Sequence, residues 1–364
     1  MALPKLGHLA ALDGIRGVAV AIVVLHHLKL PWIHSGWLGV DLFFALSGFL
    51  ITVSVLGTGD GTSLAAFWRR RAWRLGPAMA VLLAWYAVIS VGASDRGMRF
   101  TWLGASAGQF LDIHDAASVH GPFSPHLGHL WSLSMEVQFY IVWPLLLMAL
   151  VRHGAPRAVI FAAPLLLFVL STVERTVLAM QDMSWNRLYL GPDTRSTALW
   201  AGCMVGLLHA WGAFDRSRVL RPLCSALAIP AVVALGWLVI LPSMNFVLRA
   251  PELWGLTVIG TCGWIIVAAG ASARGGPLRF LLESAPLAWL GRISYSVYLW
   301  HVPLIAELLR ARPDLSTPAK AAIIIPASLL AGWLSYVVIE RPLLSSAGRA
   351  RLRARLSRSP APVG

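Results

Sequence analysis

Apolar segments that follow one another along the chain constrain its fold more than any other feature of the sequence. Ten of them approach or reach the length of a helix that crosses a bilayer, near 18–30, 37–57, 76–93, 130–151, 158–180, 197–212, 223–241, 253–271, 293–310 and 320–339. Because lipid offers the backbone no hydrogen-bond partners, such segments must be helical. We therefore predict an all-α, polytopic integral-membrane bundle of about ten transmembrane helices.

The composition supports a membrane protein and excludes several other classes. Of the 364 residues, 57% are hydrophobic and 13% are charged, whereas a soluble domain carries about 25% charged residues. This balance excludes a soluble enzyme, a disordered chain and a small secreted scaffold. An outer-membrane barrel is excluded because its strands alternate in runs of about ten residues. The cysteines, Cys203, Cys224 and Cys262, match neither a zinc site nor a disulfide framework.

The excess of basic residues indicates how the chain is oriented in the membrane. The formal net charge is +14, from 30 basic and 16 acidic residues. With the N-terminus inside and the spans alternating, nineteen Lys and Arg fall on the inner side and nine on the outer side. We therefore predict a multi-pass protein of the bacterial cytoplasmic membrane with both termini in the cytoplasm, and no nucleic-acid partner.

Two further segments complete the predicted organisation. Phe100–Ile113 is apolar but too short to cross the membrane, so we interpret it as an interfacial or re-entrant piece, followed by an external loop over 114–129. That loop holds four His at mixed spacings, which is more typical of an ordinary loop than of a metal site, and we expect no metal. Residues 1–345 form one transmembrane domain, and 346–364 form a basic cytoplasmic tail at the inner membrane surface.

The first span carries two ionisable residues on one face. Arg16 and His27 are eleven residues apart, which is three helical turns plus about 20°, with a rise of about 16.5 Å. An ionisable residue inside a span is costly and points to function. The rise is close to the length of an extended phosphopantetheine arm. The spacing alone suggests a donor with its phosphates near Arg16 and its thioester near His27.

Two carboxylates enter the bundle at a depth that the sequence predicts to match that of His27. Asp41 lies one turn into the second span and Glu136 one to two turns into the fourth, and both spans begin on the outer side. A carboxylate beside an imidazole raises its basicity and fixes its tautomer, as a general base requires. A purely structural ion pair is the alternative interpretation.

A cluster of arginines opens the third span on the inner side. In Phe67–Pro77, Arg70 and Arg74 are four residues apart, and Arg71 and Arg74 are three apart. Either pair would place two guanidinium groups on one helix face, as a two-pronged anion clamp beneath Arg16. The alternative is a positive-inside signal without a ligand.

Together these segments resemble the acyltransferase 3 family of integral-membrane acyltransferases, over nearly the whole chain. LDGIRG and LHH are similar to its opening motif, a basic residue and a His with ten residues between them, here Arg16 and His27. GWLGVDLFFALSGFLIT resembles its second span, with Asp41 and Ser47, and RRRAWR resembles its Arg-x-x-Arg element, which selects Arg71 and Arg74.

The later motifs extend the resemblance, with some departures. HLWSLSMEVQFYIVWPLLL places Glu136 at the acidic position, LGRISYSVYLWHVPL contains His301, and IERPL contains Glu340 and Arg341. Val137 stands where the family usually has a second acidic residue, and Thr197 where it often has Asp. The hydrolase-like C-terminal domain of some members is missing, so the resemblance implies an enzyme that acts without that fused domain.

The resemblance implies an acyl-CoA donor and a sugar hydroxyl as acceptor. We therefore expect an O-acyltransferase that moves an acetyl or other short acyl group from cytoplasmic acyl-CoA to a glycan or a glycosylated small molecule. Arg71 and Arg74, with Arg16, would bind the phosphates of the donor.

At the reacting end, His27 would act as general base, or briefly as a nucleophile that carries the acyl group. Asp41 or Glu136 would orient it. Ser47 and His301 are expected to contact substrate, although packing is an equal alternative for His301.

A transporter or flippase without acyl-transfer chemistry is the alternative function, because polar residues in spans also mark substrate paths. Its usual cue, a pair of matched interrupted helices in two halves of the chain, is missing from this sequence. Release of free coenzyme A separates the two, since only a transferase produces it.

The charge distribution predicts the result of reporter fusions. A reporter placed after Arg358 should read cytoplasmic, and one in the loop around His120 should read external. If both read the same side, the count of ten spans is wrong and Phe100–Ile113 crosses the membrane.

Overall fold

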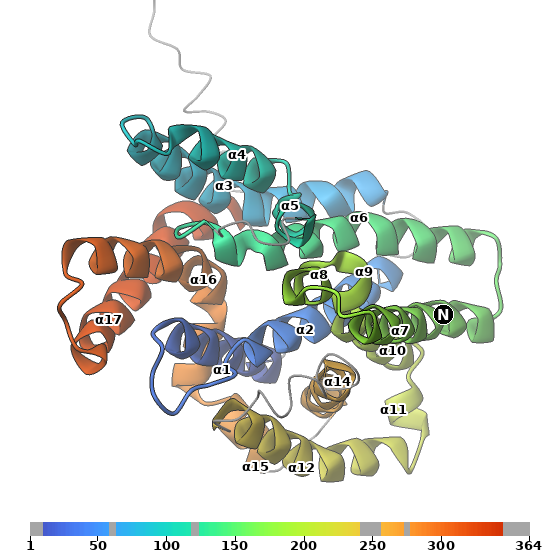
Figure 1. Cartoon of the computed structure of the whole chain (residues 1–364). Coiled ribbons are helices and arrows are strands. Elements are labelled where there is room, and N and C mark those ends of the chain that lie inside the picture. Colours follow the sequence, from blue (N-terminus) through green and yellow to red (C-terminus); the bar gives the residue numbers. More distant parts are fainter. Residues whose placement is uncertain (1–9, 58–62, 118–123, 241–255, 273–276, 345–364) are drawn as a thin grey trace, which may run out of the picture.

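The computed structural model describes residues 10–57, 63–117, 124–240, 256–272 and 277–344, and every regular element in these ranges is helical (Figure 1). The first half contains α1 (Ala10–His27), α2 (Leu38–Leu56), α3 (Leu64–Ser90), α4 (Arg96–Ala107), α5 (Leu111–Ala117), the 3₁₀ turn η2 (Gly128–Leu130), α6 (Trp131–Arg152) and α7 (Arg157–Met180). The second half contains α8 (Trp185–Leu190), α9 (Pro192–Arg195), α10 (Thr197–Ala210), α11 (Ala213–Arg216), α12 (Leu220–Ile240), α14 (Leu256–Ser272), α15 (Pro277–Leu282), α16 (Ala285–Ala311), α17 (Thr317–Ser335), the π-helical turn η4 (Tyr336–Glu340) and α18 (Arg341–Leu344). The all-α prediction is confirmed.

Each of the ten predicted spans corresponds to one helix. Seven helices are long and apolar enough to cross a membrane, namely α1, α2, α3, α6, α7, α12 and α17 together with the turns that continue α6 and α17. The other three predicted spans fall on the shorter apolar helices α10 and α14 and on the 27-residue α16. The number of crossings and the side of each terminus stay predictions. The predicted cytoplasmic tail lies outside the described residues.

The helices are arranged around a central group. In α2, 78% of the most apolar stretch is buried inside the protein, against 17% in α7 and 22% in α3. Large apolar side chains of α7 and α12, such as Leu166 and Val233, are therefore exposed where lipid would cover them. Because so little of α2 contacts the surroundings, its polar side chains face other helices.

Glycines let the central backbones touch. A Cβ atom on Gly291 of α16 would lie 1.8 Å from the carbonyl oxygen of Asp13, and one on Gly17 of α1 would lie 2.4 Å from that of Leu287. A Cβ atom on Gly48 of α2 would likewise lie 2.1 Å from the carbonyl oxygen of Leu199 in α10. Small residues at such crossings allow the close van der Waals packing that holds membrane helices together.

The first helix starts and ends earlier than its apolar run predicted. It begins at Ala10 and ends at His27, and Lys29 has a left-handed φ of 53°. A residue with positive φ cannot continue a right-handed helix, so the chain turns here. His27 is therefore the last residue of α1, whereas Arg16 lies well inside it.

The segment Phe100–Ile113 forms parts of two short helices, α4 and α5, which are separated by Gln109 at a φ of 59°. With 12 and 7 residues, neither is long enough to cross a bilayer. The side-chain amide of Gln138 on α6 donates a hydrogen bond to the carboxylate of Asp112 at 2.9 Å, which joins α5 to α6. Burial raises the pKa of Asp112 to about 6.

The close crossing of α1 and α16 predicts how two glycine substitutions differ. Gly291→Ala should lower the stability of the detergent-solubilised protein by about 1–3 kcal/mol, because the new methyl group collides with the backbone of α1. Gly236→Ala in α12 is the matched control, since its Cβ would have no atom within 4 Å. Thermal unfolding measures both, and an equal effect of the two would contradict the packing described here.

Candidate active site

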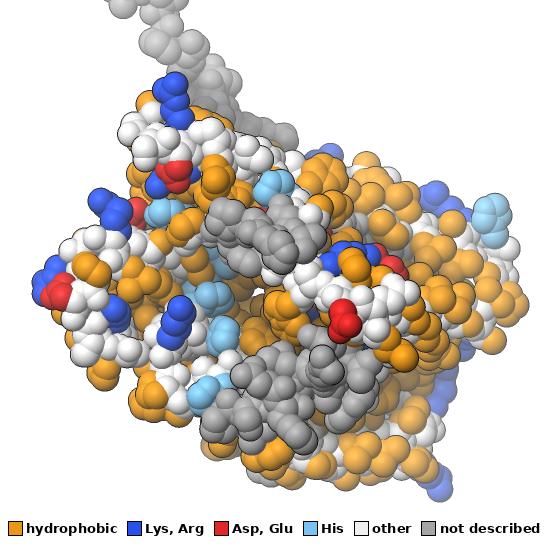
Figure 2. All heavy atoms as spheres, in the orientation of Figure 1, with side chains coloured by type: hydrophobic (Ala, Val, Ile, Leu, Met, Phe, Trp, Pro, Cys, Tyr) orange, Lys and Arg blue, Asp and Glu red, His pale blue; other side chains and the backbone are white. Residues whose placement is uncertain are grey.

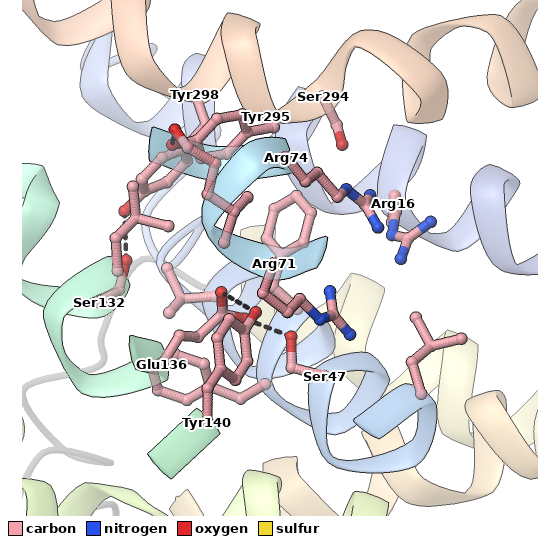
Figure 3. Close-up of a pocket in the computed structure, with 16 residues that line it drawn as sticks. Arg16, Ser47, Arg71, Arg74, Ser132, Glu136, Tyr140, Ser294, Tyr295 and Tyr298 are labelled. Atoms are coloured by element: carbon pink, nitrogen blue, oxygen red, sulfur yellow. Dashed lines mark hydrogen bonds between the residues drawn. The ribbon is translucent and has the colours of Figure 1, made fainter. Parts of the chain in front are cut away.

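A pocket of about 650 Å³, part of it open space at its mouth, lies between α1, α2, α3, α6 and α16 (Figure 3). Five helices that are distant in sequence contribute to it. Its polar lining consists of Arg16, Ser47, Arg71, Arg74, Ser132, Glu136, Tyr140, Ser294, Tyr295 and Tyr298. The pocket thus brings together three guanidinium groups and one carboxylate within a bundle of apolar helices.

The structure selects one of the two arginine pairs of α3. Arg71 and Arg74 line the pocket, whereas Arg70 is exposed and does not line it. The guanidinium of Arg71 lies over the ring of Tyr140, 5.0 Å from its centroid, which holds it in place by a cation–π interaction. Arg16 approaches from α1 and donates to Asp13 at 2.9 Å.

Glu136 belongs to this pocket rather than to the surroundings of His27. Its carboxylate accepts hydrogen bonds from Ser47 and, at 2.9 Å, from Tyr140. Ser47 lies six residues beyond Asp41 on α2, which is a rise of about 9 Å. The prediction that Glu136, Asp41 and His27 share one depth is therefore wrong. Counting turns from the start of each span assumes that all spans start in one plane, and these helices do not.

A proline in α6 helps to attach α3 beside this carboxylate. Pro144 has no N–H, so the carbonyl of Tyr140, four residues earlier, loses its usual helical partner. The indole of Trp68 on α3 donates to that oxygen at 2.8 Å. This bond joins α3 to α6 within one turn of Arg71 and next to Tyr140.

Asp41 pairs with an arginine that the sequence reasoning did not consider. Both of its carboxylate oxygens accept from Arg195, one of them at 2.7 Å, and both side chains are buried. The Arg195 guanidinium also lies 4.8 Å from the ring centroid of Tyr189. Asp41 is thus engaged in a buried, bidentate ion pair, as the alternative interpretation held, and no hydrogen bond between the described residues joins it to His27.

His27 lies in a cluster of histidines. Its ring centroid is 5.6 Å from that of His26 and 5.0 Å from that of His301, and His301 is 5.2 Å from His129. The space-filling view shows His side chains around a hollow near the middle of the visible face (Figure 2). The side chain of His27 is partly exposed. Its Nδ1 lies 2.9 Å from the carbonyl oxygen of Val23.

The neighbours of His27 fix which nitrogen is available for chemistry. A carbonyl oxygen only accepts, so Nδ1 of the neutral His27 ring carries the hydrogen and Nε2 carries the lone pair. His301 is completely buried, with Nδ1 2.7 Å from the Tyr298 oxygen and Nε2 3.4 Å from Nδ1 of His27. Both nitrogens of His301 are therefore engaged within the protein, which favours the packing alternative over a direct contact with an acceptor.

A second proline explains the position of His129. Pro303 in α16 deprives the carbonyl of Leu299, four residues earlier, of its helical donor. Nε2 of His129 lies 3.2 Å from that oxygen and donates to it. His129 thus satisfies a buried carbonyl and is part of the framework of the cluster.

Tyr298 stands between the arginine pocket and the histidine cluster. Its side chain lines the pocket, and its ring centroid lies 5.4 Å from that of His301. Its hydroxyl donates to the His129 carbonyl at 2.7 Å and contacts the Ser132 hydroxyl at 2.7 Å. His27 and His301 do not line the pocket, so the predicted residues form two adjacent groups rather than one.

Sequence reasoning missed three residues with clear roles in this geometry: Tyr140, Tyr298 and Arg195. Tyr140 lies four residues after Glu136 on one helix face, a spacing that could have revealed it. Arg195 is 154 residues from Asp41, and only the fold brings them together. Within the described ranges, no group of three or more His, Cys, Asp and Glu residues is arranged to bind a metal ion.

Comparison with known proteins gives consistent matches. The model of a family described as an acyltransferase domain matches residues 9–337. The chain is 32% identical over 361 residues to YrhL of Bacillus subtilis, covering 94% of this chain and 56% of that protein. It is 30% identical over 355 residues to the peptidoglycan O-acetyltransferase OatA of Listeria monocytogenes, covering 92% and 56%. The chain thus spans little more than half the length of these relatives. No solved structure matches it significantly.

The bond between His129 and the carbonyl freed by Pro303 predicts a rescue. His129→Phe should destabilise the protein by about 1–3 kcal/mol, because it leaves the buried Leu299 oxygen without a donor. Adding Pro303→Ala restores an N–H at position 303 and should recover part of that loss. Thermal unfolding of the two single variants and the double variant tests this coupling. Strictly additive effects would mean that the two residues act independently.

Proposed function

The chain belongs to the family of acyltransferase domains, and from this premise we propose that it is a membrane O-acyltransferase that uses acyl-CoA. It would transfer an acetyl or other short acyl group to a hydroxyl of a carbohydrate or sugar-bearing acceptor in the bacterial cytoplasmic membrane. The names of the OatA relatives, peptidoglycan O-acetyltransferase and O-acetyltransferase, support acetyl transfer and a cell-wall glycan as acceptor.

The observation that carries the proposal is the unequal charge of the pocket. Three guanidinium groups line it against the single lining carboxylate of Glu136, and with Asp13 counted as the partner of Arg16 the cations still outnumber the carboxylates by one. Like charges held together in a bundle of apolar helices repel one another, and an anionic ligand relieves that repulsion. The phosphates of coenzyme A are such a ligand, and guanidinium groups bind phosphate oxygens with two parallel hydrogen bonds.

The length of α1 supports the path of the donor. Arg16 in the pocket and His27 at the helix end lie on one helix, about 16.5 Å apart along its axis. An extended pantetheine arm anchored at the arginines has the reach to bring its thioester near His27. It would pass beside Tyr298, which lines the pocket and also contacts the histidine cluster.

The proposed chemistry is direct transfer with general-base catalysis. Nε2 of His27 takes the proton of the acceptor hydroxyl while that oxygen bonds to the acyl carbon. The carbon–sulfur bond breaks, and the thiolate of coenzyme A leaves and takes up the proton from His27. Direct transfer needs no covalent intermediate, and the Nε2 lone pair supports it.

Arg71 and Arg70 provide a matched pair of variants for the donor site. Arg71→Ala should raise the KM for acetyl-CoA about tenfold or more, since a charge-assisted contact to phosphate contributes about 1.5–3 kcal/mol. Arg70→Ala, on the exposed side of α3, should change it little. Release of coenzyme A measures both. Acetyl-CoA that lacks the ribose 3′-phosphate should be less affected by Arg71→Ala. An equal loss with both donors would mean that Arg71 serves only membrane orientation.

His27→Ala tests the proposed base. Loss of a general base typically lowers the rate by 10²–10⁴-fold, so acyl transfer should become undetectable while the protein stays monodisperse in detergent. The His26→Ala variant should lose much less activity, because His26 contacts His27 ring to ring and makes no hydrogen bond to it. Binding of a non-hydrolysable acetyl-CoA analogue, measured by thermal shift, should survive His27→Ala. Retention of more than about a tenth of the turnover would exclude this mechanism.

A further inference from the structure

His27 is oriented by a neutral imidazole instead of a carboxylate, and we propose that His301 is the positioning residue that makes it a general base. This inference rests on the proposed function. The two carboxylates that the sequence offered for this role are both engaged elsewhere: Asp41 with Arg195, and Glu136 with Ser47 and Tyr140. The contact that remains to the His27 ring from another helix is Nε2 of His301, at 3.4 Å.

The direction of this contact follows from a chain of hydrogen bonds. The carbonyl of Tyr298 only accepts, so Nδ1 of His301 carries a hydrogen and donates to it at 2.7 Å. In the neutral ring, Nε2 of His301 then holds a lone pair and can only accept. It faces Nδ1 of His27, which is therefore the donor. The Val23 carbonyl, 2.9 Å from the same nitrogen, imposes the same tautomer.

Burial keeps His301 in this orientation. It has no exposed surface, and its ring meets His27 edge-on at 70° and His129 edge-on at 74°. Nε2 of His129 donates its hydrogen to Leu299, so the neutral His129 ring has no second N–H that could compete for the lone pair of His301. Turning the His301 ring would break its bond to Tyr298 inside an apolar bundle, where an unpaired donor is costly.

The arrangement defines what His301 does during transfer. When His27 takes the acceptor proton at Nε2, positive charge spreads over its ring, and the lone pair of His301 stabilises the Nδ1–H side. His301 does not pass the proton onward, because its own hydrogen is directed at a carbonyl. It acts through His27 and touches neither the donor nor the acceptor.

Two substitutions at His301 and one control test this role. His301→Phe keeps a ring but removes the acceptor that another helix offers to Nδ1 of His27, leaving that N–H only the Val23 carbonyl of its own helix, whereas His301→Gln offers an amide oxygen of similar reach. His26→Phe is the control, since His26 also meets His27 edge-on, at 75°, but makes no nitrogen contact with it. Each variant of the full chain is assayed in detergent with acetyl-CoA and an N-acetylglucosamine oligosaccharide, for kcat and for the KM of the donor.

His301→Phe should lower kcat about 10- to 100-fold, as expected for a lost hydrogen bond to a group that becomes charged, with the KM for acetyl-CoA unchanged. His301→Gln should recover most of that loss, and His26→Phe should resemble the wild type. Wild-type kcat in His301→Phe, or a joint change of kcat and KM that Gln does not repair, would overturn the inference while His27→Ala stays inactive. An inactive wild type, or an active His27→Ala, would overturn the proposed function itself.

Discussion

The close crossing of α1 and α16 is the constraint on which the rest of the structure depends. Gly17 and Gly291 allow the two backbones to touch, so their relative position along the membrane normal is fixed to within a fraction of a turn. Arg16 and His27 both lie on α1, while Tyr298 and His301 both lie on α16. One helix crossing therefore determines where the arginine pocket and the histidine cluster fall, and how far apart they are.

The bundle contains two kinds of buried charged site, one with balanced charges and one with excess positive charge. Asp41 and Arg195 neutralise each other in a buried bidentate ion pair, which serves the fold and needs no ligand. In the pocket, guanidinium groups outnumber carboxylates, and aromatic rings rather than acids hold Arg71. An ion pair balances its own charge, whereas a cluster with excess positive charge would be balanced by the anionic donor proposed above. This contrast separates the structural arginine from those proposed to bind the donor.

The sequence predicted features that depend on local periodicity. The ten apolar segments each correspond to one helix, and Arg71 and Arg74, three residues apart, line the same pocket. It failed where the result depends on tilt and on pairing between distant segments. Glu136 reaches Ser47 rather than the level of Asp41, because the helices do not start in one plane. The partner of Asp41 and the engagement of His301 follow from contacts over 154 and 274 residues, which no local pattern encodes.

The carbonyl freed by Pro303 has a consequence for motion. His129 donates to Leu299, and Tyr298 donates back to the carbonyl of His129, so the start of α6 and the middle of α16 are joined in both directions. Sliding one helix along the other would expose an unpaired carbonyl to an apolar environment. The two bonds therefore oppose sliding between these helices, and a movement that widened the space beside His27 would have to leave this connection of α6 with α16 intact.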